Sequence, residues 1–453
     1  MSSLFDVGKS AVQSYRQALA VTGQNIANIN TDGYKRRTAD LEEVSGSQGG
    51  ITSLASQSGL GVRVSDIRRA FDGFLLSRAN NTNASFQKVD AFVRNLQQIE
   101  NIMLPSKGGL NEQIGRFFSS LSDVAASPTD IASRAVALEV GKSLVASFQG
   151  LASQLKQFQL STISQLQAGT EQLSVLAKEL ASINSQILSS GQSGQTPNAL
   201  LDLRDKTIGQ MSAFSSISVS YSGLGVATVS LGQSGIGPIL VDGSKFRSLG
   251  YIESFGTVQV AIGEGAVMRP TNQVDGGLLS GAIDSYSLIE ELENEIDNLA
   301  FLISSQMNAQ HRRGVDLDGN AGLDMFSTFG LSAELSPSVS PEVRLQIEVT
   351  DPLSLPSERL TAVFDKQTGL WSLDGGELAK PINGKETLRG EGFTIHISGD
   401  PKNGDYFEIK RAASAASNIQ LLITKPQQIA ASGLLKVEAA MNNTSDASVE
   451  VAS

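Results

Sequence analysis

The sequence contains no cysteine and few of the other residues from which catalytic or metal centres are built. With no cysteine among 453 residues, disulfides, thiolate metal sites and cysteine nucleophiles are excluded. The two histidines, His311 and His396, lie far apart along the chain, which argues against a histidine-based triad or a transition-metal cluster. We therefore predict that the chain is not an enzyme and has no catalytic residue, no metal site and no cofactor.

Positive charge and long apolar runs are also scarce. The formal net charge is −11, whereas a nucleic-acid-binding surface needs clustered cations, so we predict no nucleic-acid partner. The charge also disfavours an anionic membrane surface. No run approaches 18 apolar residues, so we expect no membrane span. The N-terminus lacks the basic and apolar regions of a cleavable signal peptide, so export would need another route.

Aromatic residues make up 6% of the chain and hydrophobic residues 40%, which is low for a thick globular core. Ser, Gln, Ala, Asn and Gly fill the difference. This composition favours long helices with shallow packing. The first such helix is predicted over about residues 3–30, from apolar and small residues spaced by three and four: Leu4, Gly8, Ala11, Tyr15, Leu19, Thr22, Ile26 and Ile29. Gly33, just before Tyr34, is predicted to supply a left-handed end to the helix. So thin a stripe is marginal alone, so this helix needs partners.

Four more helices follow from the same period. A stripe from Phe86 to Met103 predicts one, and a shorter helix covers about 110–126. The longest pattern runs from Leu144 to Ile187 with coiled-coil-like spacing, and we expect an interruption at Gly169. A last helix is predicted over roughly 278–310.

Two regions change to the alternating period of strands. Residues 214–270 carry strand-like runs near 226–231 and 238–241, with a turn at Asp242-Gly243. From about 335 to 411 the pattern is clearly β, with turns expected at 374–375 and 383–384. The predicted fold class is mainly α with β: a long coiled-coil-like helical domain that carries a β-rich excursion and a small outer β domain.

The remaining polar motifs favour structural roles. Asp316, Asp318 and Asn320 resemble the start of a calcium loop, but Ala321 and Ser327 stand where that loop needs Gly and Glu, so we interpret them as a turn. We predict that His311 has a cationic or hydrogen-bonding role at a helix C-terminus and that His396 faces solvent. The acidic row of the last helix is interpreted as a solvated face: Glu290, Glu291, Glu293, Glu295 and Asp297.

Three segments resemble known proteins. Residues 19–36 (LAVTGQNIANINTDGYKR) resemble the N-terminal signature of bacterial flagellar rod, hook and hook-associated proteins. Residues 196–205 (TPNALLDLRD) and 308–326, which include Gln310-His311 and Asp316, are similar to segments of the hook-associated protein 1 family. The resemblance extends over essentially the whole chain.

The resemblance implies a subunit of the extracellular flagellum that forms a ring at the hook–filament junction. It implies contacts with further copies, the hook protein and a second hook-associated protein, and passage through the type III export apparatus with an export chaperone. It places the N-terminal helix in an inner tube, so we predict an assembly interface of Leu4, Ala11, Tyr15, Leu19, Asn25, Ile26, Asn28, Ile29, Gly33 and Tyr34. Asn25 and Asn28 are candidates for bonds between subunits or for plain capping.

The resemblance also sets the expected domains. These are an N-terminal tube helix and exit turn (1–45), a linker loop (46–67), an α domain (68–334), a β domain (335–411), and an exit segment with a disordered tail from 441 (412–453). Family members end in long return helices, including the region bound by the chaperone, and nothing after Leu435 resembles them, so we expect a truncated chain. A hook or rod subunit is the alternative; a secreted enzyme on a helical stalk and a coiled-coil adhesin agree less well with the motifs.

Overall fold

The computed structural model describes the helices and most strands of the chain. The described residues are 2–44, 61–104, 108–192, 197–254, 256–265, 267–336, 343–351, 354–356, 359–365, 370–374, 387–411 and 414–433. They divide into two compact units, which share three long helices. The first unit comprises Met1–Asn95, Thr162–Glu253 and Val258–Ser285, and the second comprises Leu96–Ser161, Ser254–Thr257 and Tyr286–Ser453.

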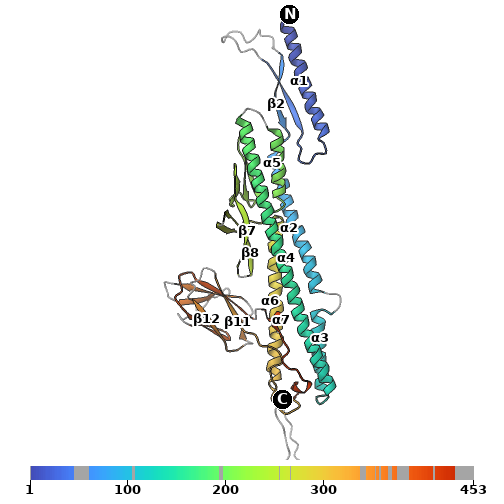
Figure 1. Ribbon diagram of the computed structural model, residues 1–453, viewed down its shortest axis with the longest axis vertical. Coiled ribbons are helices and arrows are strands. Elements are labelled where there is room, and N and C mark those ends of the chain that lie inside the picture. The colour runs from blue at the N-terminus through green and yellow to red at the C-terminus, as the bar shows by residue number, and fades with distance from the viewer. Residues whose placement is uncertain are drawn as a thin grey trace, which may run out of the picture. The chain divides into compact units, whose positions relative to one another are not determined.

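The first unit begins with helix α1 (Ser2–Ala27), which packs on an antiparallel ribbon of strands β1 (Arg37–Glu43) and β2 (Val62–Arg69) (Figure 1). Gly33 has the predicted left-handed conformation (φ 84°), but α1 already ends at Ala27, so Gly33 turns the chain toward the ribbon instead of ending the helix. The ribbon corrects the expected linker loop: residues 62–67 are paired strand, and residues 45–60 lie outside the described part.

Three long helices supply the scaffold: α2 (Gly73–Met103), α4 (Ile131–Gln192) and α6 (Gly277–His311). Helix α4 continues through Gly169, contrary to the predicted interruption. A side chain there would approach Leu279 to 2.7 Å, so the glycine permits close helix packing instead of breaking the helix.

The β excursion lies between α5 (Asn198–Met211) and α6, as two antiparallel sheets. One has the order β3-β4-β5-β6, with strands Ile217–Tyr221, Ala227–Leu231, Ile239–Asp242 and Lys245–Phe246. The other has the order β7-β8-β9, with strands Ser248–Ser254, Thr257–Glu264 and Val267–Thr271. The predicted strands and the turn at Gly243 are confirmed.

The second unit contains α3 (Leu110–Ala126) and the outer β domain, which starts at Leu331 instead of 335 (Figure 1). One sheet has the order β11-β17-β13-β14 (Leu331–Leu335, Tyr406–Arg411, Leu360–Asp365, Leu370–Asp374), and the other β12-β16-β15 (Arg344–Val349, Phe393–Ser398, Thr387–Gly390). The single tryptophan, Trp371, is fully buried between Phe364 and Phe407. Its position makes it an internal probe of this domain.

The chain leaves the β domain through short elements. These are α7 (Ala415–Asn418), a 3-10 turn (Pro426–Gln428) and β18 (Ser432–Gly433), which pairs with β10 (Gly314–Val315). The predicted turn at 383–384, residue 375 of the other turn and the predicted disordered tail lie outside the described residues.

Candidate assembly interface

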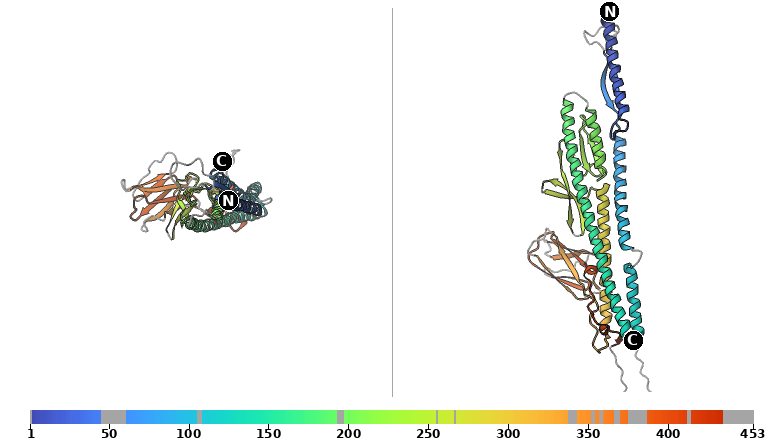
Figure 2. Two further views of the ribbon diagram at one scale, coloured as in Figure 1. Left: turned by 90° about the horizontal axis from the view of Figure 1, so that it is seen from above. Right: turned by 45° about the vertical axis from the view of Figure 1, so that its right-hand side comes forward.

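Helix α1 runs alongside strand β2 (Figure 2), and its residues form two rows with opposite roles, one facing the ribbon and one facing away from it. The inner row contains the buried Val21 together with small and polar residues, and two of its serines bond to the ribbon backbone. Ser14 Oγ donates to Val62 O (2.8 Å), and Val62 N donates to Ser10 Oγ (3.2 Å). Serine side chains are short, so these hydrogen bonds form only where the backbone of β2 lies close to α1. The inner row therefore fixes the helix on the ribbon.

The outer row of α1 carries the large apolar side chains, and they are exposed. Leu4 is 81% exposed, Leu19 70% and Ile26 69%, and Phe5, Val12, Tyr15 and Ile29 are also mostly exposed. Phe5, Val12, Leu19 and Ile26 recur every seven residues, the spacing of one position of a coiled-coil seam. Such a row is typical of a surface that packs against another helix.

The predicted interface residues are therefore divided by the structure. Leu4, Tyr15, Leu19, Ile26 and Ile29 lie on the exposed side of α1 or just after it, and Ala11 is half-buried. A groove of about 620 Å³ lies between the end of α1 and the start of β1, and Ile26 and Ile29 line it with Tyr34. These residues give the surface its apolar character.

For Asn25 and Asn28 we predicted either capping or bonds between subunits; the structure shows bonds within the chain, and contact with other subunits stays a prediction. Asn25 Oδ1 accepts from Arg37 N (2.9 Å) and Tyr34 Oη (2.8 Å), and its Nδ2 donates to Arg37 O (2.8 Å). Asn28 donates to Gln24 O (2.9 Å) and accepts from Thr31 Oγ1 (3.2 Å). Asn25 thus joins helix to strand, and Asn28 caps the end of the helix.

Residues 198–205 of the segment TPNALLDLRD form the start of α5 and place two carboxylates against the ribbon. Asp202 bridges Arg37 (3.2 Å) and Arg69 (3.2 Å), and Asp205 pairs with Arg69 (2.6 Å) and Arg204 (2.6 Å). Arg69 lies over Phe71 and Arg204 over Tyr221, with 4.7 Å and 4.3 Å from guanidinium carbon to ring centre. The cluster is buried, and neither the ribbon nor these bonds were expected from the sequence. The alternation of Val62 and Val64 is the signal that could have indicated the second strand.

The third segment closes the end of α6 in the second unit. His311 Nδ1 donates to Leu323 O (2.5 Å), and Nε2 accepts from Ala430 N (2.8 Å). Both bonds suit a neutral ring, and burial lowers the pKa of His311. Of the two roles predicted for His311, the hydrogen-bonding one agrees with the structure and the cationic one does not, and His396 is exposed as predicted. Asp316 accepts from the backbone of Asp318 and Asn320 (2.9 and 2.8 Å), so this motif is a turn.

The acidic row of α6 is only partly a solvated face, which corrects the prediction. Glu291 and Glu295 are exposed, but Asp297 is 8% exposed and accepts from Ser414 N (2.7 Å) and Ala416 N (2.8 Å). Glu290 pairs with Arg359 (3.2 Å) and Lys410 (3.1 Å) of the β domain. These carboxylates therefore hold the β domain and its exit segment on α6.

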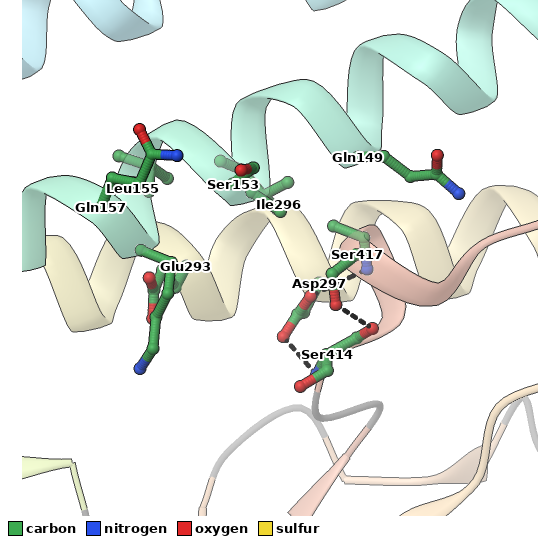
Figure 3. A pocket seen from close by; sticks show the side chains of 12 residues that line it. Gln149, Ser153, Leu155, Gln157, Glu293, Ile296, Asp297, Ser414 and Ser417 are labelled. Atoms are coloured by element: carbon green, nitrogen blue, oxygen red, sulfur yellow. Dashed lines mark hydrogen bonds between the residues drawn. The ribbon is translucent and has the colours of Figure 1, made fainter.

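Glu293 lies between those two carboxylates and faces a pocket of about 480 Å³, which Asp297, Ser414 and Gln149 also line (Figure 3). Its Oε1 is buried without a hydrogen-bond partner among the described residues. Burial, together with the charges of Glu290 and Asp297, raises the pKa of Glu293 to about 7, although Lys156 and Lys410 oppose the shift. The charge of this carboxyl group therefore changes near neutral pH.

Within the described ranges, no three acidic or histidine side chains lie close enough to hold a metal ion. In the same ranges, no helix is long and apolar enough to cross a membrane. The described residues present an exposed apolar surface on α1, and buried hydrogen bonds and ion pairs that connect helices to strands.

In a comparison with known protein families, two family models each match one segment of the chain. The family model described as the flagellar hook-associated protein FlgK helical domain matches residues 96–326, just over half of the chain. The model of the flagella basal body rod protein matches residues 5–35, which include most of α1 and its exit turn.

Individual relatives agree with the family models. Flagellar hook-associated protein 1 of Escherichia coli (strain K12) is 27% identical over 444 residues, covering 95% of this chain and 79% of that protein. The same protein of Bacillus subtilis (strain 168) is 27% identical over 431 residues, covering 87% and 83%. The solved flagellar hook junction protein FlgK from Burkholderia pseudomallei shares the fold, with a TM-score of 0.67 at 20% identity. That match covers 79% of this chain and 66%, just under two thirds, of the solved chain. This chain belongs to the flagellar hook-associated protein FlgK family.

Proposed function

We propose that this chain is a structural subunit of the bacterial flagellum at the junction between hook and filament, outside the cell. The observation that supports this function most directly is the exposed apolar row of α1. Large apolar side chains gain about 1.5–3 kcal/mol each when a partner removes them from water. Burial of several such side chains on one helix therefore favours helix–helix association between subunits, against the entropy that association costs.

The contacts follow from the position of this row. The exposed side chains of α1 pack against helices of neighbouring copies in a ring, and the two ends of the ring contact the hook protein and a second hook-associated protein. Passage through the type III export apparatus, with an export chaperone, is part of the same proposal. The relatives are flagellar proteins, which supports a structural role.

Immunogold electron microscopy on intact flagella of the source bacterium tests the location. An antibody against this chain should place gold at the hook–filament boundary, and a strain that lacks the gene should show none. Gold along the whole hook, or at its base, would support the alternative of a hook or rod subunit. Gold along the filament, or absent from the flagellum, would contradict the proposal.

A further inference from the structure

The base of the β1–β2 ribbon places two positive charges directly opposite each other. Arg37, the first residue of β1, is the register partner of Arg69, the last residue of β2. Like charges at directly opposed positions destabilise strand pairing. The side chain of Arg69 is buried (6% exposed) and that of Arg37 is largely covered (18% exposed), so water screens the repulsion poorly. Strands β1 and β2 can therefore pair at Arg37 and Arg69 only if negatively charged groups from elsewhere in the chain neutralise the two arginines.

Helix α5 supplies those anions. The two oxygens of Asp202 contact one arginine each, Oδ2 with Arg37 Nη2 and Oδ1 with Arg69 Nη1, both at 3.2 Å. Asp205 contacts Arg69 (2.6 Å) but also neutralises Arg204. Asp202 is thus the carboxylate that bridges the opposed pair, and the cluster holds three guanidinium groups for two carboxylates.

The ribbon in turn holds α1 at two points. Ser10 and Ser14 bond to the backbone of Val62 at one end of β2, and Asn25 bonds to both backbone groups of Arg37. Each of these bonds requires the strand backbone to be in place. A single helix with small inner residues gains little from its own hydrogen bonds in water. The order of α1 is therefore tied to the order of the ribbon.

We propose that Asp202 is a positioning residue that controls the ordering of the N-terminal arm, from α5 to the ribbon and from the ribbon to α1. The consequence for assembly rests on the proposed function, because α1 carries the surface that packs against other subunits. A subunit presents that surface in a fixed direction only when the carboxylate lies between the two arginines.

Hydrogen–deuterium exchange on the full chain, read by mass spectrometry, tests this dependence. Asp202→Asn keeps the shape of the side chain and removes its charge. The matched control is Asp40→Asn, since Asp40 lies on the same ribbon and pairs with the mostly exposed Arg68. We expect Asp202→Asn to speed exchange in residues 2–27, 37–43 and 62–69 by about tenfold or more, as for loss of a buried charged bond. Exchange in α4 should stay unchanged, and Asp40→Asn should stay within about twofold of the original chain throughout.

A second substitution separates charge from packing. Arg37→Gln, added to Asp202→Asn, removes one of the two opposed charges and should recover part of the lost protection. If Asp202 only fills space, the double variant should exchange as fast as Asp202→Asn or faster, which overturns the proposal. It is also overturned if Asp202→Asn leaves the ribbon protected, if α4 loses protection equally, or if α1 is unprotected in the original chain. These readouts use the isolated chain, so they stand or fall independently of where gold appears on the flagellum.

Discussion

Asn308 and Phe326 are joined by a pair of hydrogen bonds that closes the junction after α6. Asn308 Nδ2 donates to Phe326 O, and Phe326 N donates to Asn308 Oδ1, both at 2.8 Å, and both residues are buried. The side-chain amide of Asn308 thus pairs with both backbone groups of Phe326, as a residue of a neighbouring β-strand would. It also holds Phe326 against Phe117 of α3, with ring centres 5.7 Å apart.

Substitution of Asn308 should therefore be strongly destabilising. Asn308→Ala leaves a buried donor and a buried acceptor unpaired, which should lower the free energy of unfolding by about 2–4 kcal/mol. Urea unfolding followed by the fluorescence of Trp371, in the same unit, measures the change. Gln306→Ala, at an exposed site of the same helix, should change stability by less than about 0.5 kcal/mol. Equal effects of the two substitutions would show that the pair is not specific.

Two glycines in helices should respond to alanine with opposite signs. A Cβ on Gly281 of α6 would lie 2.5 Å from Lys88 O of α2, whereas a Cβ on Gly150 of α4 would meet no atom within 4 Å. Gly150→Ala should stabilise its unit by about 0.5–1 kcal/mol, because alanine has the higher helix propensity. Gly281→Ala should destabilise by about 1–3 kcal/mol, since α2 and α6 must separate. Circular dichroism during urea unfolding checks both, and a stabilising Gly281→Ala would contradict the close approach.

The sequence predicted the positions of the long helices because their signals are local, but the predicted stripes begin well inside α2 and α4, and no helix was predicted for α5. The bounds of α3 agree with the prediction, and α6 differs from it by one residue at each end. What periodicity could not reveal is which face of a helix meets the rest of the chain. In α2 the apolar residues Phe86, Val89 and Val93 are exposed, while Ala84 and Ala91 are buried. Contacts with residues distant in the sequence decide which face is buried. Gly281 has no side chain, so the backbone of α6 lies close to the face of α2 that carries Ala91.

Polar residues were harder to interpret for the same reason. Glu290 and Asp297 look like part of a solvated row until the cations and backbone amides from residues 359–416 are brought to them. Asn25 likewise finds its partner in a ribbon strand. The exposed apolar residues of α1 remain a predicted interface, because no other described part of the chain covers them.

Stability of the second unit should depend on pH through Glu293. The folded protein holds this proton up to about pH 7, whereas an unfolded chain releases it near 4.5. The folded state therefore binds more protons between these values, so stability falls as pH rises through this range. Burial raises the pKa of Asp297 and Glu408 too, which adds to the same trend.

Glu293→Gln should flatten that dependence. The variant should gain roughly 1–3 kcal/mol relative to the original chain at pH 8, after allowance for partial exposure, and little or nothing at pH 5. Trp371 fluorescence in urea at a series of pH values measures this. Glu291→Gln removes a charge from the exposed side of the same helix and serves as the control. A pH profile unchanged by Glu293→Gln would mean that its carboxylate is ionised in the folded protein across the range.

Ile26→Asp should separate assembly from folding. The side chain is 69% exposed, so a carboxylate there meets water in the isolated chain and should shift the melting temperature by less than about 2 °C. In a helix-packing interface the same carboxylate would lose its water without a partner, which opposes association by several kcal/mol. We therefore expect a flagellum that fails to incorporate the variant, seen as loss of gold at the junction and loss of swimming in soft agar.

Gln17→Asp places the same charge on another exposed position of α1 and should assemble normally. If Ile26→Asp assembles as well as Gln17→Asp, the exposed apolar row is not the contact surface. If instead its melting temperature falls sharply, Ile26 is needed for folding, and the assembly surface must be sought elsewhere on the chain.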